Sequence, residues 1–199
     1  MMTTDPAGQI KQPLQPSIVV KVGGSLYDHP ALGPGLRCFL ASLEADSGKI
    51  LIVPGGGPFA DAVRHLDRIH RLGESAAHQI ALASLHAARA FLHQLCPGYL
   101  LLDAETCSAT VETLPQTWAV TTDSIALEAA NMLRARRLLL LKSVDIPSTC
   151  SWSDAATHGW IDSFFPTLAE ASSVMIHAMN FRHWLNWHFP QSILGYNNL

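Results

Sequence analysis

The sequence predicts an α/β protein with a mainly parallel sheet that is covered by helices on both faces. Short apolar runs alternate along the chain with longer segments of helical periodicity, and this alternation is typical of sheets built from crossover connections. Two of the runs, residues 18–22 and 50–53, lead directly into glycine-rich turns, and each turn is followed by a helical pattern. With 199 residues the chain is long enough for one domain with a substantial core.

The first quarter of the chain sets this pattern. Residues 18–22 form a nearly continuous apolar run, as expected of a strand that is buried on both faces, and residues 50–53 form a second. Apolar residues at helical spacing predict a helix over 32–43 between them. The next helix begins at the triple glycine, where Pro58 suits its first position, and it is predicted to end at Gly73.

A long helix is predicted over residues 75–95. Ser75 is its candidate N-cap, and Pro97 and Gly98 stop it. Apolar residues lie on two of its sides, which indicates a central helix or one at a subunit interface, and we therefore expect a homodimer or a higher homo-oligomer. One side carries Ile80, Ala83, Ala87 and Phe91, and the other carries Leu85, Ala88, Leu92 and Leu95.

The rest of the chain continues the alternation. Residues 106–114 are predicted to be loop or strand. Strands are predicted at 99–102, 118–121, 138–141 and 174–177, with a last short strand near Ile193. Helices are predicted at 123–133, 165–171 and 181–187.

Composition excludes several classes of protein. The net charge of −3 gives no general attraction to nucleic acid or to an anionic membrane. No apolar run reaches 18 residues, and the N-terminus lacks a basic segment followed by an apolar one, so a cytoplasmic protein is expected. Residues 1–16 are predicted to be a mobile N-terminal tail, and residues 17–199 a single domain. Four widely spaced cysteines predict buried or free thiols: Cys38, Cys96, Cys107 and Cys150.

The two glycine-rich turns are the first candidate site. In a parallel sheet they place bare backbone N–H groups and two helix N-termini at the same edge, and such an edge attracts phosphate. Lys21, two residues before the first turn, would neutralise charge on a transferring phosphoryl group. The alternatives are an ordinary turn with a lysine that reaches solvent, and a flexible connector. The candidate phosphate-binding residues are Gly23, Gly24 and Ser25 in the first turn and Gly55, Gly56 and Gly57 in the second.

Two further charged residues are predicted at the same edge. Asp123 lies at a strand-to-helix junction, where it would orient Lys21 or help to hold magnesium. The alternative is an acidic residue without a functional role, stabilised in the first turn of a helix by the helix dipole. Lys142 ends the strand at 138–141, where it would reach a phosphate or lie in solvent. The ten histidines form no metal-binding pair, so we expect no metal held by protein side chains alone.

These residues resemble the amino acid kinase superfamily, which includes acetylglutamate, aspartate, uridylate and isopentenyl phosphate kinases. The resemblance rests on four motifs whose order and separations match over residues 17–146. It implies a three-layer αβα sandwich. The motifs are Lys21-Val-Gly-Gly-Ser25, Gly55-Gly-Gly57, Thr122-Asp-Ser-Ile-Ala126 and the leucine-rich strand before Lys142.

A narrower resemblance is to the aminomethylfuran phosphate kinase branch of methanofuran biosynthesis and its relatives in bacterial one-carbon metabolism. It rests on residues 54–64, 76–81, 114–126, 139–144 and 159–166. It implies ATP-dependent phosphorylation of [5-(aminomethyl)furan-3-yl]methyl phosphate, with Mg²⁺ bridging the nucleotide phosphates. It also implies that the first glycine turn holds the nucleotide and the second holds the acceptor.

The sequence departs from the superfamily at two places. The turn after the leucine-rich strand reads Ser143-Val-Asp-Ile-Pro147 instead of an Asp-Val-Asp-Gly type. Residues 164–199 contain no lysine, so the later lysine that the superfamily places near the nucleotide phosphates has no clear counterpart. Lys142 is one candidate to replace that later lysine. A non-catalytic member of the fold that binds a nucleotide or metabolite is therefore the alternative function.

Overall fold

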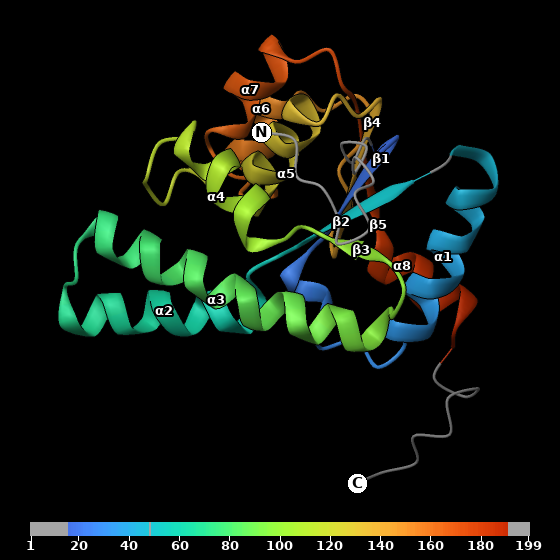
Figure 1. Ribbon diagram of the computed structural model, residues 1–199, viewed down its shortest axis with the longest axis horizontal. Coiled ribbons are helices and arrows are strands. Elements are labelled where there is room, and N and C mark those ends of the chain that lie inside the picture. The colour runs from blue at the N-terminus through green and yellow to red at the C-terminus, as the bar shows by residue number, and fades with distance from the viewer. Residues whose placement is uncertain (1–15, 48, 191–199) are drawn as a thin grey trace, which may run out of the picture.

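Five parallel strands form one central sheet in the computed structural model, which describes residues 16–190 apart from residue 48. Their order across the sheet is β3-β2-β1-β4-β5, so the first strand in sequence lies at the centre (Figure 1). The strands are β1 (Ile18–Val22), β2 (Ile50–Pro54), β3 (Leu100–Leu101), β4 (Arg137–Lys142) and β5 (Met175–Asn180).

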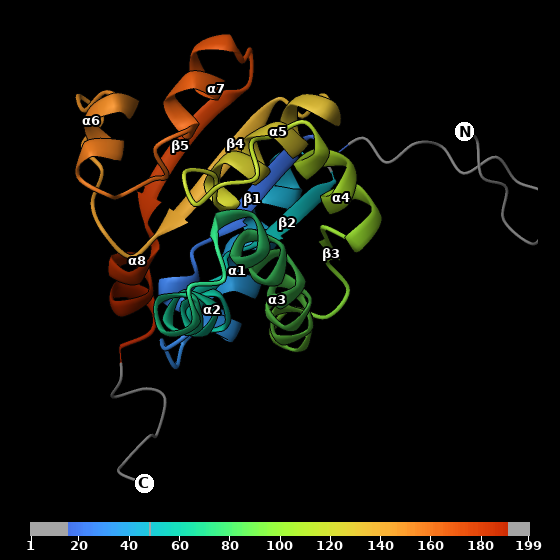
Figure 2. The ribbon, with the colours of Figure 1, turned by 90° about the vertical axis from the view of Figure 1, so that its left-hand side faces the viewer.

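Helices cover both faces of this sheet (Figure 2), which confirms the predicted three-layer arrangement. Helices α1 and α8 pack on one face, and α4, α5, α6 and α7 on the other, while α3 contributes to both cores. The helices are α1 (Leu32–Ser47), α2 (Gly57–His70), α3 (Glu74–Leu95), α4 (Ala104–Glu112), α5 (Thr122–Met132), α6 (Trp152–Thr157), α7 (Phe165–Ala171) and α8 (Phe181–His188), with a short 3₁₀ turn, η1 (Gly24–Leu26).

The alternation of side chains along each strand divides the core in two. On β1, Val19 packs in the core beneath α5, whereas Val20 packs in the core beneath α1. Leu138 and Leu140 of β4 join Val19 on the α5 face. Successive side chains of a strand point to opposite faces, so the parity of a residue decides which helix it meets.

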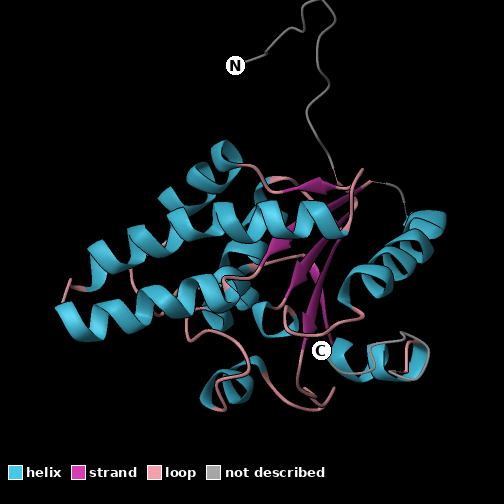
Figure 3. Ribbon diagram, turned by 90° about the horizontal axis from the view of Figure 1, so that it is seen from below, coloured by secondary structure: helices cyan, strands magenta, loops and turns pink. Residues whose placement is uncertain are grey.

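The helices α2 and α3 form an antiparallel pair that extends well beyond the sheet (Figure 3). The predicted end of α2 at Gly73 is wrong, because the left-handed residue that ends this helix is Arg71, with a φ of 51°. Gly73 instead adopts a φ of 86° as the N-cap of α3, and Ser75 lies inside that helix without capping it. Two left-handed residues thus make the tight connection between the helices.

The segment from 104 to 121 differs most from expectation. Most of the predicted loop or strand at 106–114 is helical, as far as Glu112, because Asp103 caps α4 by accepting a hydrogen bond from the Thr106 backbone N–H at 2.7 Å. The predicted strand at 118–121 is absent from the described structure. The N–H of Thr121 donates to the Asp162 carboxylate at 2.9 Å instead of to a neighbouring strand, so no ladder forms there.

Most of the other predicted elements are present in the structure. The remaining strands and helices agree with the predictions to within a few residues, but α6 was not predicted. The short strand near Ile193 and most of the tail over residues 1–16 lie outside the described residues. The four cysteines are free, as predicted. Within the described part of the chain, every helix is too short or too polar to cross a membrane.

The two glycine turns touch each other at the carboxyl edge of the sheet. The Gly55 N–H donates to the Val22 carbonyl at 2.8 Å, which ties the second turn to the end of β1. A Cβ atom added to Gly24 would lie 2.1 Å from the Gly57 nitrogen, so a side chain there would collide with backbone. Only glycine allows the two turns to approach this closely.

We expect Gly24→Ala to lower the free energy of unfolding by roughly 2–4 kcal/mol, because the two turns must separate to admit the methyl group. Urea denaturation would measure this change. Gly98→Ala is the matched control: Gly98 has a φ of 89° but nothing within 4 Å of an added Cβ, so only backbone strain of about 1 kcal/mol is expected. Equal effects of the two substitutions would contradict this account of the turns.

Candidate active site

Strand parity and register bring the two predicted lysines to the same face of the sheet. β1 and β4 are hydrogen-bonded neighbours, with Lys21 in register with Leu140. Lys21 follows Val19 by two residues and Lys142 follows Leu140 by two, so both lysines point toward the face that α5 covers. Both also lie near the carboxyl edge, where ligands of open parallel sheets bind.

Asp123 lies between these lysines, in the first turn of α5. Its Oδ1 atom is 2.7 Å from Lys21 Nζ, and Lys142 Nζ donates to its Oδ2 atom at 2.8 Å. The side chains are almost entirely buried, with exposed fractions of 6% for Lys21, 5% for Asp123 and 12% for Lys142. Lys142 is therefore not the solvated strand end that was one alternative from the sequence.

Burial and the charges of the neighbouring side chains shift the pKa values of Asp123 and Lys142. Burial opposes ionisation of Asp123, but the charges of Lys21 and Lys142 and their hydrogen bonds outweigh it and lower the pKa of Asp123 to about 2. Burial and the charge of Lys21 lower the pKa of Lys142 to about 8, against the opposing attraction of Asp123. At neutral pH two ammonium groups thus share one carboxylate, and net positive charge remains at the sheet edge.

A second buried carboxylate, that of Asp162, fixes the start of α5. It accepts hydrogen bonds from the backbone N–H groups of Thr121, Ser124 and Phe165, at 2.9 Å each. It also accepts from the hydroxyl groups of Thr121 and Ser124, at 3.0 and 2.5 Å. These five bonds hold the backbone on both sides of Asp123, so Asp162 positions the central carboxylate.

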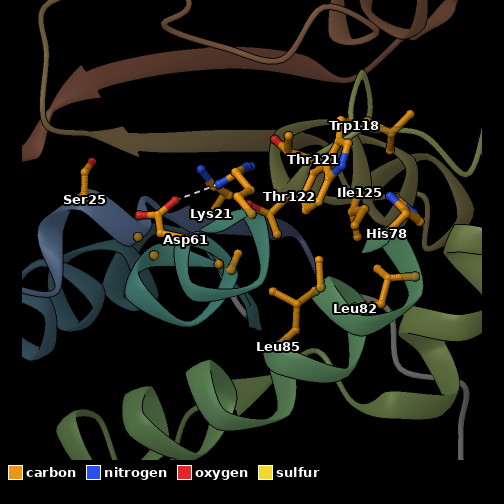
Figure 4. A pocket seen from close by; sticks show the side chains of 17 residues that line it. Lys21, Ser25, Asp61, His78, Leu82, Leu85, Trp118, Thr121, Thr122 and Ile125 are labelled. Atoms are coloured by element: carbon orange, nitrogen blue, oxygen red, sulfur yellow. Dashed lines mark hydrogen bonds and ion pairs between the residues drawn. The ribbon is translucent and has the colours of Figure 1, made fainter. Parts of the chain in front are cut away.

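A cavity of about 250 Å³ opens beside this cluster, between the glycine turns and the pair α2–α3 (Figure 4). Lys21 and four of the predicted phosphate-binding residues line it: Gly24, Ser25, Gly56 and Gly57. Gly23 and Gly55 lie behind them, where Gly23 donates its N–H to the Leu141 carbonyl at 2.8 Å and Gly55 accepts from the Tyr27 hydroxyl at 2.7 Å.

The cavity also has walls that were not predicted as part of the site. Arg64 projects from α2, pairs with Asp61 at 2.8 Å and lies 4.9 Å from the ring centre of Trp118. The indole N–H of Trp118 donates to Asp67 at 3.3 Å, and its backbone N–H donates to Glu74 at 3.1 Å. The loop that carries Trp118 is thereby fastened to the α2–α3 pair.

Sequence reasoning missed Asp162, Arg64, Trp118 and the cavity-lining His78. Their side chains approach the site from four separate parts of the chain, and no local spacing joins them. The available signal was that all four residues fall inside segments that carried the narrower resemblance. Among residues 16–190, no three His, Cys, Asp or Glu side chains are grouped so as to hold a metal ion.

The proteins that the chain resembles include a curated relative and two kinases of known structure. The chain is 24% identical over 200 residues to the [5-(aminomethyl)furan-3-yl]methyl phosphate kinase of Methanocaldococcus jannaschii, covering 83% of this chain and 88% of that protein. Its structure matches uridylate kinase from Archaeoglobus fulgidus with a TM-score of 0.62, at 16% identity, over 82% of this chain and 90% of that one. UMP kinase from Bacillus anthracis gives a TM-score of 0.57, also at 16% identity, over 92% and 93% of the two chains. No protein-family model matches the chain.

The chain therefore has the amino acid kinase fold that its sequence predicts. The narrower resemblance to the aminomethylfuran phosphate kinase branch is confirmed as a similarity by the curated relative. All three similar proteins are kinases, the enzyme class that the glycine turns and Lys21 predicted.

The lowered pKa of Lys142 predicts a measurable effect on stability. Between pH 8 and 10.5 the folded protein has released this proton while the unfolded chain still holds it, so raising the pH favours the folded state. We expect the unfolding free energy of the protein minus that of its Lys142→Met variant to rise by on the order of 1–3 kcal/mol over this range. Urea titrations at a series of pH values would measure the difference.

Lys49→Met provides the control for this titration, because Lys49 is exposed and lies outside the cluster. Its difference from the unmodified protein should stay flat across the same pH range. A flat difference for Lys142→Met as well would mean that the pKa of Lys142 is the same in the folded and unfolded chains.

Proposed function

We propose that the chain is an ATP-dependent kinase that transfers the γ-phosphoryl group of ATP to a small molecule that carries a phosphate or a carboxylate group. The observation that carries this proposal is the buried cluster of Lys21, Asp123 and Lys142 beside two touching glycine turns. The first candidate acceptor is [5-(aminomethyl)furan-3-yl]methyl phosphate, the compound in the name of the curated relative. An oxygen of the acceptor phosphate would attack the γ-phosphorus, and the bond to the β-phosphate oxygen would break, leaving ADP and a diphosphate product.

The proposed roles follow from the geometry. Lys21 lines the cavity and would stabilise the charge of the transferring phosphoryl group, while Asp123 holds its ammonium group in place. Gly24 and Ser25 would hold the nucleotide phosphates, and Gly56 and Gly57 the acceptor phosphate, while Gly23 and Gly55 would shape the two turns from behind, since their own N–H groups bond to Leu141 and Val22. Lys142 would supply the second positive charge that the superfamily takes from a later lysine. Phosphoryl transfer requires little covalent chemistry from the protein, so positioning and charge neutralisation suffice.

Magnesium fits this site as a companion of the nucleotide. Mg²⁺ prefers oxygen ligands, keeps several waters and commonly binds through substrate phosphates, and the described residues offer no dedicated cage. When bound, it would supply further neutralisation of the phosphate charges. Because the proposed reaction consumes ATP, we propose the cytoplasm as its location.

The first experiment is an assay of purified protein with ATP and Mg²⁺ against several acceptors. The panel contains the aminomethylfuran phosphate, isopentenyl phosphate, UMP, acetylglutamate and aspartate, with ADP release and product mass as readouts. We expect Lys21→Ala to reduce turnover of the preferred acceptor by roughly 10²–10³-fold, corresponding to about 2–4 kcal/mol of lost transition-state stabilisation. Lys49→Ala, on the exposed surface, should retain full turnover.

The same assay separates the kinase from its alternative. Turnover that Lys21→Ala leaves within a few-fold of the original rate would remove Lys21 from the proposed mechanism. Calorimetric binding of ATP with no transfer to any acceptor would favour a nucleotide-binding protein without catalysis. That alternative derives from the unusual turn at Ser143–Pro147 and from the absence of a later lysine.

We also propose that α3 takes part in a homodimer. Of its two apolar sides, the one with Leu85, Ala88 and Leu92 is buried inside the chain, whereas Ile80 is 45% exposed. Three apolar residues at the neighbouring end of α2 and in the connection to α3 are also exposed, and exposed apolar side chains on paired helices favour a protein partner. They are Leu66, Ile69 and Leu72.

We expect light scattering at micromolar concentration to give the mass of a dimer or a larger assembly. Ile80→Glu combined with Ile69→Glu should shift it toward the monomer, because the charges would be desolvated at the interface. Arg68→Glu on the exposed surface of α2 serves as a charge-changing control. A monomeric mass for the unmodified protein would contradict the proposal.

A further inference from the structure

A second cavity, of about 310 Å³, lies between α3, α4 and the end of β2, and we call it the α3–α4 cavity. Leu82, Leu85 and Ile125 line both this cavity and the first one, which places them at the boundary between the two. Figure 4 shows these residues on the side of Lys21 away from Ser25. The α3–α4 cavity thus adjoins the proposed active site, but the glycine turns and the buried lysines do not line it.

Arg89 brings an unpaired positive charge to the α3–α4 cavity. It lies on α3, is half-buried and lines the cavity. Its Nε atom is buried without a hydrogen-bond partner, and its guanidinium group forms no ion pair with a carboxylate of the described residues. A guanidinium group is always charged in proteins, and buried polar groups normally have partners. Arg89 therefore indicates a missing hydrogen-bond acceptor.

The two terminal nitrogens of Arg89 are the atoms that a ligand can reach. Neither Nη atom has a hydrogen bond within the described part of the chain, yet Nε alone of the Arg89 nitrogens is both buried and without a partner. The Nη atoms therefore keep accessible surface, whereas the protein covers Nε. An anion in the cavity would accept from the Nη atoms, and it would also compensate the charge that the whole guanidinium group shares.

The other walls of the cavity define the rest of the ligand. Most of them are apolar, which favours a small molecule with an apolar body. Asp103 and Glu112 also line the cavity, and their carboxylates oppose further negative charge nearby. One arginine can therefore balance a carboxylate, with its single charge, better than a phosphate dianion. The apolar lining residues include Val53, Leu82, Leu85, Leu102, Val111 and Ile125, and His86, Ser108 and Gln116 add possible hydrogen-bond donors.

We propose that the α3–α4 cavity is a second ligand site, which binds a small organic molecule with one carboxylate group and an apolar body. The carboxylate accepts hydrogen bonds from the Nη atoms of Arg89, and the body packs against Leu102 and Val111. The proposal goes beyond the proposed function and requires neither ATP nor phosphoryl transfer. Because Leu82 and Leu85 belong to the walls of both cavities, a ligand here would contact residues that also face the proposed active site.

Cys107 gives a direct readout of whether this cavity is occupied. It lines the cavity and has a free thiol, so a bound ligand should slow its reaction with the small neutral reagent methyl methanethiosulfonate. The probe is benzoate, and the rate at each cysteine is measured by mass spectrometry of peptides. For a Kd of about 1 mM, benzoate at about 10 mM should slow the reaction of Cys107 roughly tenfold. Cys38, which is exposed on α1, should react at an unchanged rate.

Two related compounds test which chemical group the site selects. Benzamide has the same ring without the charge, and phenyl phosphate carries a dianion. Each should slow the reaction of Cys107 by less than about threefold at the same concentration. Equal protection by benzamide would mean that only the apolar walls bind the ring and would overturn the proposal. Stronger protection by phenyl phosphate would overturn the carboxylate as the ligand class, and no protection by benzoate would overturn the site itself.

Substitutions of Arg89 test its role. Arg89→Met should abolish the protection by benzoate, and Arg89→Lys, which keeps one positive charge, should retain part of it. Arg68→Met, on the exposed surface of α2, should behave as the unmodified protein does. Protection that persists in Arg89→Met would overturn the proposal. The rate for Cys107 without benzoate shows whether Arg89→Met keeps the cavity intact, and if that rate changes, Arg89→Lys decides the outcome. Because the measurement uses no ATP, its result is independent of whether the chain is a kinase.

Discussion

The carboxylate of Asp123, buried between two lysines, is the interaction on which the arrangement of this site depends. A buried ion is stable only when partners compensate its lost hydration, and here two strands and one helix each supply one member of the cluster. Lys21 comes from β1, Lys142 from the neighbouring β4, and Asp123 from the first turn of α5. Removing Asp123 would leave two buried lysines without a counter-charge, so the same contacts that prepare the site also hold the sheet against its covering helix.

This cluster is supported from behind by a second carboxylate. Asp162 accepts five hydrogen bonds from the segment 121–124 and from Phe165, and so fixes the point at which α5 begins. Burial raises the pKa of Asp162, while its hydrogen bonds with Ser124 oppose that effect. The loop before α7 therefore controls the position of Asp123 without facing the cavity itself.

The α2–α3 pair gives the site its other half. The glycine turns form a floor of backbone N–H groups, and α2 begins directly from the second turn. Arg64, Trp118 and His78 line the same cavity, whose volume of about 250 Å³ suits a small molecule. Because Trp118 donates hydrogen bonds to Asp67 and Glu74, the wall of the cavity is bonded to the same helices that carry the exposed apolar residues of the proposed dimer interface. Acceptor binding and assembly would thus involve one structural unit.

The sequence alone determined the sheet, its direction and the residues at its carboxyl edge. Apolar runs that end in glycine turns predict buried parallel strands, and strand ends in such a sheet lie along one edge, which is why Lys21, Asp123 and Lys142 could be named before their contacts were known. The segment at 118–121 was predicted wrongly as a strand. The N–H groups of Trp118 and Thr121 bond to the side chains of Glu74 and Asp162, and those of residues 119 and 120 bond to Thr117, whereas a pattern of apolar residues does not report hydrogen-bond partners.

Only the tertiary structure decided what surrounds that edge. The partners of Asp123, the support from Asp162 and the cavity beside Arg89 depend on contacts between residues far apart in the chain. Periodicity predicts the secondary structure of a segment and its buried face. It does not predict which residues from distant parts of the chain contact a buried charged or polar group. The lysines were therefore visible in the sequence, but their shared carboxylate and the second cavity were not.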